Sequence, residues 1–188
     1  MPTTVELCNA ALLKLGAEPI ATLDDASVEA DFARRLYPFV RDGLMVAHPW
    51  SFTLATARLE ADAEPPLAEF SHSFTLPGDH LRTLSAGVGQ SARGLTYRIQ
   101  GSKLLAGAQS IVLGYQRRVG EAMFPAFFIQ ALVARLAAEL CIPLTEGTSR
   151  AAELVDLAEL DLRRARLVDS QQSTPRAIED FTLIEARY

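Results

Sequence analysis

Three histidines and one aspartate are the side chains in this sequence best suited to acid–base or metal chemistry. His72 and His80 flank an expected turn, and Asp79 directly precedes His80. A metal site needs three or four ligands of matched type, and the sequence has no HExxH or CxxC spacing. We therefore expect no metal site. The remaining histidine, His48, follows an expected helix and is interpreted as a cap on its free carbonyls.

The stretch 87–94 is rich in glycine and superficially similar to a phosphate-binding loop. It lacks the Lys-Ser/Thr pair of a P-loop, and its glycines miss the G-x-G-x-x-G spacing. No helix is expected after it, so no positive helix end would face a phosphate. We expect a flexible loop. A small hydrolase or nucleotide-handling enzyme using residues 72–94 stays open as an alternative, and it requires His72, Asp79 and His80 to converge in one pocket.

The two cysteines do not form a catalytic pattern. Cys8 and Cys141 each lie on the apolar side of an expected helix, where a thiolate is disfavoured and a buried free thiol is the expected state. No G-x-S-x-G nucleophile elbow occurs in the chain. The sequence therefore predicts a protein that is not an enzyme and that uses no cofactor.

Composition indicates a globular protein. The chain has 188 residues, of which 49% are apolar and 22% charged, and its formal net charge is −5. An acidic balance argues against a general coating of DNA or of a membrane surface. The first residues, MPTTVELCN, have neither the basic nor the apolar region of a signal peptide. We therefore expect synthesis in a bacterial cytoplasm and no membrane association.

The stretch 124–141, FPAFFIQALVARLAAELC, must be positioned at the centre of the fold. Arg135 and Glu139 share one strip of the expected helix at i, i+4 spacing and can pair there. Apolar residues cover most of the remaining circumference, which is typical of the centre of a bundle or of a subunit interface. We expect Arg135 to make the stretch too short to cross a membrane, and Pro143 to end the helix. The residues predicted to pack against neighbouring subunits are Phe127, Phe128, Leu132 and Leu136.

Three further helices are expected around this one. Thr3 and Glu6 form a capping-box pattern ahead of a helix over residues 4–15, and Gly16 ends it. The second helix begins near Asp25 or Ser27, contains Pro38 and ends at His48-Pro49. The fourth runs from Thr148 or Ser149 to about Asp169. The predicted packing seam of the fourth helix consists of Ala151, Val155, Ala158, Leu162 and Ala165.

The middle third of the chain changes to a strand pattern. Residues 70–76 alternate as a half-buried strand does, Pro77-Gly78-Asp79 is a turn, and residues 80–86 are the expected partner strand. Residues 97–107 predict a hairpin around Gly101-Ser102, and 110–119 a last strand. The predicted fold class is α+β, mainly α. It comprises a four-helix body (1–49 and 120–170), a small antiparallel sheet inserted between the second and third helices (50–119) and an extended C-terminal arm (171–188).

Several short sequence motifs occur in the same order as in a known protein family. They are Leu-Gly-Ala within Glu6–Phe52, His-Pro-Trp at the end of that stretch, and Leu-Pro-x-Asp within Phe70–Leu84. The hairpin Tyr97–Gly107 and the helix Phe124–Thr145 follow. Over about residues 5–175 the chain resembles the head-to-tail adaptor proteins of tailed phages, in particular the tail tubular protein A-like family, which also occurs in gene transfer agents.

The resemblance implies a non-enzymatic ring at the head–tail junction of a virion or phage-like particle. Such a ring commonly has twelve subunits, binds the portal protein above and a tail or stopper protein below, and lets DNA pass without sequence-specific binding. We expect the C-terminal arm to contact the portal or a neighbouring subunit. A plain helical dimerisation module, with two-fold contacts, is the other alternative. The predicted contact residues of the arm are Arg176, Ile178, Phe181, Ile184 and Tyr188.

Overall fold

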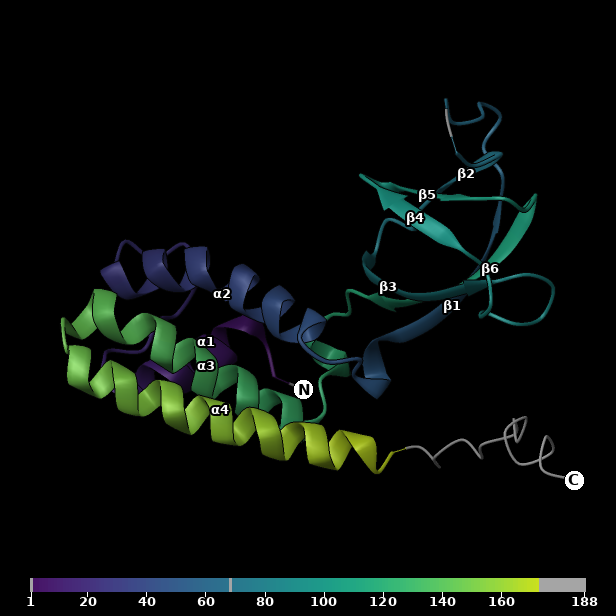
Figure 1. The fold of residues 1–188 in the computed structure, drawn as a ribbon. Helices are drawn as coiled ribbons and strands as arrows, with labels where there is room; N and C mark the ends of the chain where they lie inside the picture. Colours follow the sequence, from purple (N-terminus) through teal and green to yellow (C-terminus); the bar gives the residue numbers. More distant parts are fainter. Residues whose placement is uncertain (1, 68, 173–188) are drawn as a thin grey trace, which may run out of the picture.

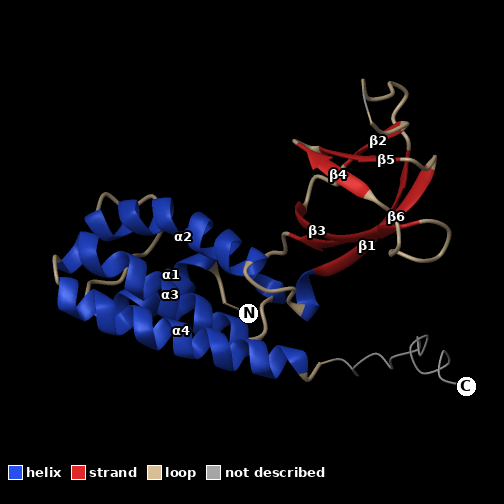
Figure 2. Cartoon of the chain, in the orientation of Figure 1, coloured by secondary structure: helices blue, strands red, loops and turns tan. Residues whose placement is uncertain are grey.

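A computed structural model describes residues 2–67 and 69–172 of the chain. They form an α+β fold in which helices predominate, as predicted, and the strands are inserted between the second and third long helices (Figures 1 and 2). The helices lie side by side in one body, and the strands lie beyond one end of it. In chain order the elements are α1 (Thr4–Leu15), α2 (Val28–Val46), η1 (Ser51–Thr53), β1 (Leu54–Glu60), β2 (His72–Thr75), β3 (His80–Gly87), β4 (Tyr97–Gln100), β5 (Lys103–Ala106), β6 (Ser110–Arg117), η2 (Glu121–Met123), α3 (Ala126–Thr145) and α4 (Thr148–Ser170).

Capping side chains set the bounds of the first two helices. Thr3 Oγ1 accepts the Glu6 N–H at 3.2 Å, and the Glu6 carboxylate accepts the Thr3 N–H at 2.7 Å. Gly16 ends α1 with a φ of 71°, a left-handed conformation that side chains with a Cβ seldom adopt. Ser27 caps α2. The predicted 4–15 helix and the predicted start of the second helix are confirmed.

Helix α3 is the core of the helical body, and α1, α2 and α4 all contact it. It continues to Thr145, so the expected stop at Pro143 is wrong. A proline this close to the end of a helix removes only one hydrogen bond. Glu146 then closes the helix in a left-handed conformation with a φ of 54°, and its N–H donates to the Ile142 carbonyl at 2.9 Å.

Among the described helices, α3 alone is long and apolar enough to cross a membrane by length and composition. It has 20 residues and a mean hydropathy of 1.7 in its most apolar window, so the expectation that it is too short is wrong. Within the structure 56% of that window is buried. Burial by neighbouring helices is the property of a core helix in a bundle.

Helix α4 packs along α3 through the predicted seam of small and apolar residues. Ala151, Ala158, Leu162 and Ala165 are buried. Val155 is 38% exposed and lies off the seam, which corrects that part of the prediction. Small residues at four- and three-residue spacing let the two helix backbones approach closely.

The strands form two three-stranded antiparallel sheets, where one sheet was predicted. Their orders are β1-β6-β3 and β2-β5-β4. The hairpin around Gly101-Ser102 is confirmed as β4 and β5. The expected pairing of 70–76 with 80–86 is wrong, because β2 pairs with β5 whereas β3 pairs with β6. The turn at 77–79 therefore carries the chain from one sheet to the other. Phe74 and Leu104 of one sheet share a core with Ile111 and Leu113 of the other.

Candidate functional site

The histidines singled out by the sequence do not converge. His72 lies on β2, whereas His80 lies on β3 in the other sheet, where its ring stacks on Tyr115 with centroids 5.8 Å apart. Tyr115 donates a hydrogen bond to the Asp79 carboxylate at 3.2 Å. Burial lowers the pKa of His80, against the opposing effect of the Asp79 charge. Asp79 and His80 thus meet around Tyr115 without His72, and no three metal-ligating side chains come together in the described part of the chain.

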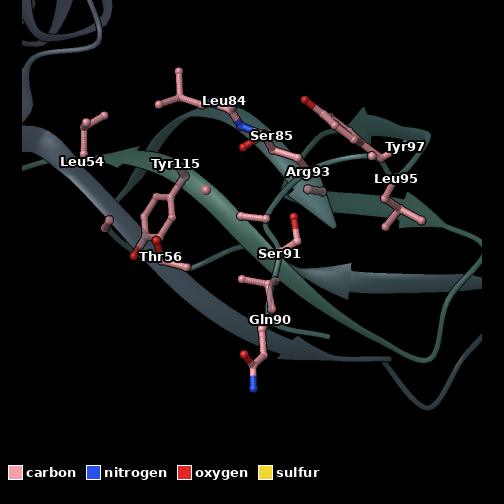
Figure 3. Close-up of a pocket in the computed structure, with 16 residues that line it drawn as sticks. Leu54, Thr56, Leu84, Ser85, Gln90, Ser91, Arg93, Leu95, Tyr97 and Tyr115 are labelled. Atoms are coloured by element: carbon pink, nitrogen blue, oxygen red, sulfur yellow. The ribbon is translucent and has the colours of Figure 1, made fainter. Parts of the chain in front are cut away.

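The glycine-rich loop closes on itself beside a pocket of about 880 Å³, whose lining side chains are drawn in Figure 3. Gly87 and Gly94 pair as an isolated antiparallel bridge. A Cβ on Gly87 would lie 2.2 Å from the Ser91 carbonyl oxygen, so the loop requires glycine there. The lining comes from β1, β3, β4, β6 and the loop, and Arg93 is the one charged side chain among the described lining residues. Strand β4 follows this loop in place of a helix. The described residues of the pocket offer hydroxyls and one cation, but no acid–base pair.

A buried polar cluster, which sequence reasoning missed, joins α2 to β6. Gln116 is fully buried, and its Nε2 lies 3.0 Å from the Met45 carbonyl oxygen, 2.6 Å from the His48 carbonyl oxygen and 3.1 Å from Thr53 Oγ1. Trp50, also fully buried, donates its indole N–H to a carbonyl in the last turns of α2 at 2.8 Å. Gln116 and Trp50 thus cap the carbonyls that the His48 side chain was expected to cap.

Asp169 extends this cluster to the end of α4. Its side chain is 4% exposed, accepts the Ser51 N–H at 3.1 Å and the Ser51 hydroxyl at 2.7 Å, and lies 3.5 Å from His48 Nε2. The three residue types are those of a hydrolase triad. Here, however, the hydroxyl donates directly to the carboxylate, so His48 does not lie between the two groups as the general base of a triad does. The cluster Gln116, Trp50, Asp169, Ser51 and His48, called the joint below, fixes the end of α4 against the start of the β-rich insertion.

The residues predicted to pack against neighbouring subunits mostly belong to the core of a single chain. Phe128, Leu132 and Leu136 have no exposed surface. Phe127 is half-buried, with its ring centroid 6.2 Å from that of Trp50. The prediction assumed that one chain does not cover a helix that is apolar nearly all round. Helices α1, α2 and α4 together do cover it, so the prediction is wrong for Phe128, Leu132 and Leu136.

The charged strip of α3, Arg135 and Glu139, lines the floor of a groove between α2 and α4. Arg135 pairs with Glu139 at 2.7 Å, as the spacing predicted, and with Glu159 of α4 at 3.6 Å. This strip lines a groove of about 470 Å³, called the α2–α4 groove below. The groove also has apolar walls, and its most exposed member, Phe39, is 78% exposed. Leu36 and Val40 of α2, and Leu162 and Arg166 of α4, also line the groove.

Helix α4 carries a second apolar surface on the side away from the groove. Leu157 is 56% exposed and Val168 is 40% exposed. Successive helical residues are rotated by about 100°, so Leu157 and Val168 point roughly opposite to the groove residues Glu159 and Arg166. The helical body therefore has an apolar groove along one side of α4 and exposed apolar side chains along the other.

The predicted partner-contacting residues Arg176, Ile178, Phe181, Ile184 and Tyr188 lie outside the described residues. The described chain ends at Gln172, two residues after α4 and directly beyond the joint. No protein-family model matches this chain, and no curated protein matches it either.

Proposed function

We propose that this chain is a structural head-to-tail adaptor of a tailed phage or phage-like particle. One structural observation carries the proposal, namely the two different apolar surfaces on opposite sides of α4. When one surface of a protein fits a different surface of the next copy, the contact is heterologous, and repeated heterologous contacts close into a ring if the rotation between copies allows it. The ordered sequence landmarks of the adaptor family support the same assignment.

In the proposed ring, Leu157 and Val168 of one copy pack against Phe39 in the α2–α4 groove of the next. Full burial of a large apolar side chain stabilises a fold or a complex by about 1.5–3 kcal/mol of free energy. In a single chain Phe39 is 78% exposed and Leu157 is 56% exposed, so most of this stabilisation becomes available only when another surface covers them. This contact replaces the one expected through α3, whose apolar residues are already covered.

The proposed partners follow from the same assignment. Twelve copies form the ring, the portal protein binds the arm that begins after α4, and a tail or stopper protein binds the β-rich end. DNA passes through the centre without sequence-specific contacts. A net charge of −5 favours passage, because an acidic wall repels the phosphate backbone. The ring is assembled from chains made in the host cytoplasm and functions at the head–tail junction of the particle.

Disulfide cross-linking between copies tests the proposed contact. Phe39→Cys and Leu157→Cys are introduced into one chain, and the chain is oxidised in cells that produce the particle. The native Cys8 and Cys141 are buried and do not compete. Heterologous contacts predict a ladder on a non-reducing gel whose longest product equals the ring's copy number. Each single variant is the matched control and gives no ladder.

Two outcomes would overturn the proposed contact. Cross-linking that stops at dimers indicates a two-fold contact and therefore a dimerisation module. No cross-linking indicates that Phe39 and Leu157 of neighbouring copies do not meet, because a disulfide forms only when the two Cα atoms come within about 7 Å.

A further inference from the structure

The α2–α4 groove contains a polar group without a partner as well as its apolar walls. Arg135 in the groove pairs with Glu139 and Glu159. Arg166 lines the same groove, has no carboxylate within ion-pair distance among the described residues, and its buried Nε–H donates to none of them. A ligand that brings a carboxylate to the Arg166 guanidinium and apolar side chains to Phe39 and Leu162 would therefore match the groove in charge and in polarity.

The chain's own C-terminal sequence has this combination. Residues 173–188 read STPRAIEDFTLIEARY. Ile178, Phe181 and Ile184 recur every third residue, and the acidic pair Glu179-Asp180 lies between the first two. Two glutamates in the groove, Glu139 and Glu159, are already paired with Arg135. The carboxylates of the segment therefore have Arg166 as their partner, and its apolar side chains have the apolar groove walls.

We propose that, in a free subunit, residues 176–184 bind in the α2–α4 groove of the same chain. In this arrangement Phe181 packs on Phe39 and Leu162, and a carboxylate of the Glu179-Asp180 pair binds Arg166.

The chain that follows α4 is long enough to reach back to the α2–α4 groove. Helix α4 ends at Ser170, and the groove residues Arg166 and Ala158 lie four and twelve residues before that end. At 1.5 Å per residue these positions are about 6 Å and about 18 Å along the helix. Residues 173–175 span up to about 10 Å for the reversal, and nine extended residues span up to about 30 Å. A short linker of this kind gives an effective concentration on the order of millimolar.

Such docking has a consequence for assembly, and this consequence rests on the adaptor proposal. The groove that takes the C-terminal segment is the groove proposed to take Leu157 of the next copy. A subunit whose segment is docked therefore does not form a ring until another partner, such as the portal, removes the segment. The docking itself does not depend on the adaptor role.

Hydrogen exchange of the full-length chain tests the docking. In the wild-type chain the groove wall at 36–47 is covered, and its amides exchange slowly. Phe181→Asp with Ile184→Asp should raise exchange there about tenfold, the change expected when a segment held at millimolar effective concentration with a ~100 μM intrinsic affinity is released. The matched control, Thr182→Asp with Ala186→Asp, should leave exchange unchanged.

Variants of the groove complete the test. Phe39→Asp should reproduce the effect of the double Asp variant outside the substituted site. Leu13→Asp is the control, because Leu13 is 79% exposed on α1 and does not line the groove. Arg166→Glu should also release the segment, and Glu179→Arg with Asp180→Arg in the same chain should restore protection by reversing both charges.

Two results would overturn the docking. Equal exchange at 36–47 in the wild-type chain and the segment variants shows that the segment does not cover the groove. Protection that appears only as the chain is concentrated from about 1 to about 100 μM shows a contact between copies instead of one within a chain. Because exchange is measured on isolated subunits, the docking can fail while the cross-linked ladder still forms, and the reverse also holds.

Discussion

At the scale of residues, buried polar side chains hold the two parts of the molecule together. Gln116, Trp50 and Asp169 are all buried at the joint, and their partners lie on elements far away in the sequence. The sequence offered little sign of them. Asp169 lies at the end of an expected helix that is rich in charged residues, and Gln116 precedes two arginines. A buried polar residue is recognised by its partners, and these are brought close only by the tertiary fold.

Replacing Gln116 by Leu tests the joint. The change removes the donor to the carbonyls of Met45 and His48 and leaves these acceptors buried, so we expect the free energy of unfolding to fall by about 1–3 kcal/mol. Urea denaturation measures it. Gln100→Leu, at an exposed position of β4, is the matched control and should change stability by less than about 0.5 kcal/mol. Equal losses in both variants would show that the Gln116 amide does not stabilise the joint.

His48 should make the joint sensitive to acid. Burial lowers its pKa in the folded chain below the ordinary value of 6.5, and Arg166 lowers it further, whereas Asp169 opposes the shift. The unfolded chain therefore binds the proton more readily. Stability from neutral His48 is fully present above about pH 6.5 and is lost as the pH falls through that value towards the lower folded pKa.

This pH dependence is measured by urea denaturation at pH 7.5 and pH 5.5. His48→Asn removes the titrating ring, so the difference in stability between the two pH values should shrink. Burial lowers the pKa of His80 in the same direction. The double variant with His80→Asn should therefore reduce the difference further. A double variant that keeps the full wild-type difference would contradict the assignment of the acid sensitivity to these histidines.

At the scale of elements, local signals predicted the helices well and the strand pairing poorly. The capping box at Thr3, the cap at Ser27 and the small-residue seam of α4 are properties of neighbouring residues, so they could be predicted from the sequence. Pairing of β2 with β5 and of β3 with β6 depends on contacts between distant segments. The coverage of α3 also depends on tertiary packing, since an all-round apolar helix suits a bundle centre and a subunit interface equally.

Substitution of two leucines on neighbouring helices distinguishes a side chain packed in the core of one chain from a side chain left for a subunit interface. Leu132 of α3 has no exposed surface, and Leu132→Ala should lower the free energy of unfolding by about 2–5 kcal/mol because it leaves a cavity. Leu157 of α4 is 56% exposed, and Leu157→Ala should change it by less than about 0.5 kcal/mol. Thermal or urea unfolding of the single chain measures both. A large loss for Leu157→Ala would mean that this side chain is already packed within the subunit.

At the scale of the whole molecule, the joint holds together the helical body and the β-rich end that Figure 1 shows. Two apolar surfaces remain exposed on the helical body. Part of the candidate site was visible in the sequence, because the Arg135–Glu139 strip predicted the face of α3 that lines the groove. The sequence did not predict that Phe39 and Leu157 lie on opposite sides of the helical body, since their exposure depends on how α2 and α4 flank α3. The adaptor proposal now rests on these surfaces and on the sequence resemblance.

Electron cryomicroscopy of tailed particles from cells that produce this chain tests the central claim most directly. The proposal predicts a ring of density between the capsid vertex and the tail, into which copies of the helical body fit with Leu157 of each copy facing the α2–α4 groove of the next. Particles that lack this chain at the head–tail junction, or that hold it there only as two-fold pairs, would contradict the proposed function.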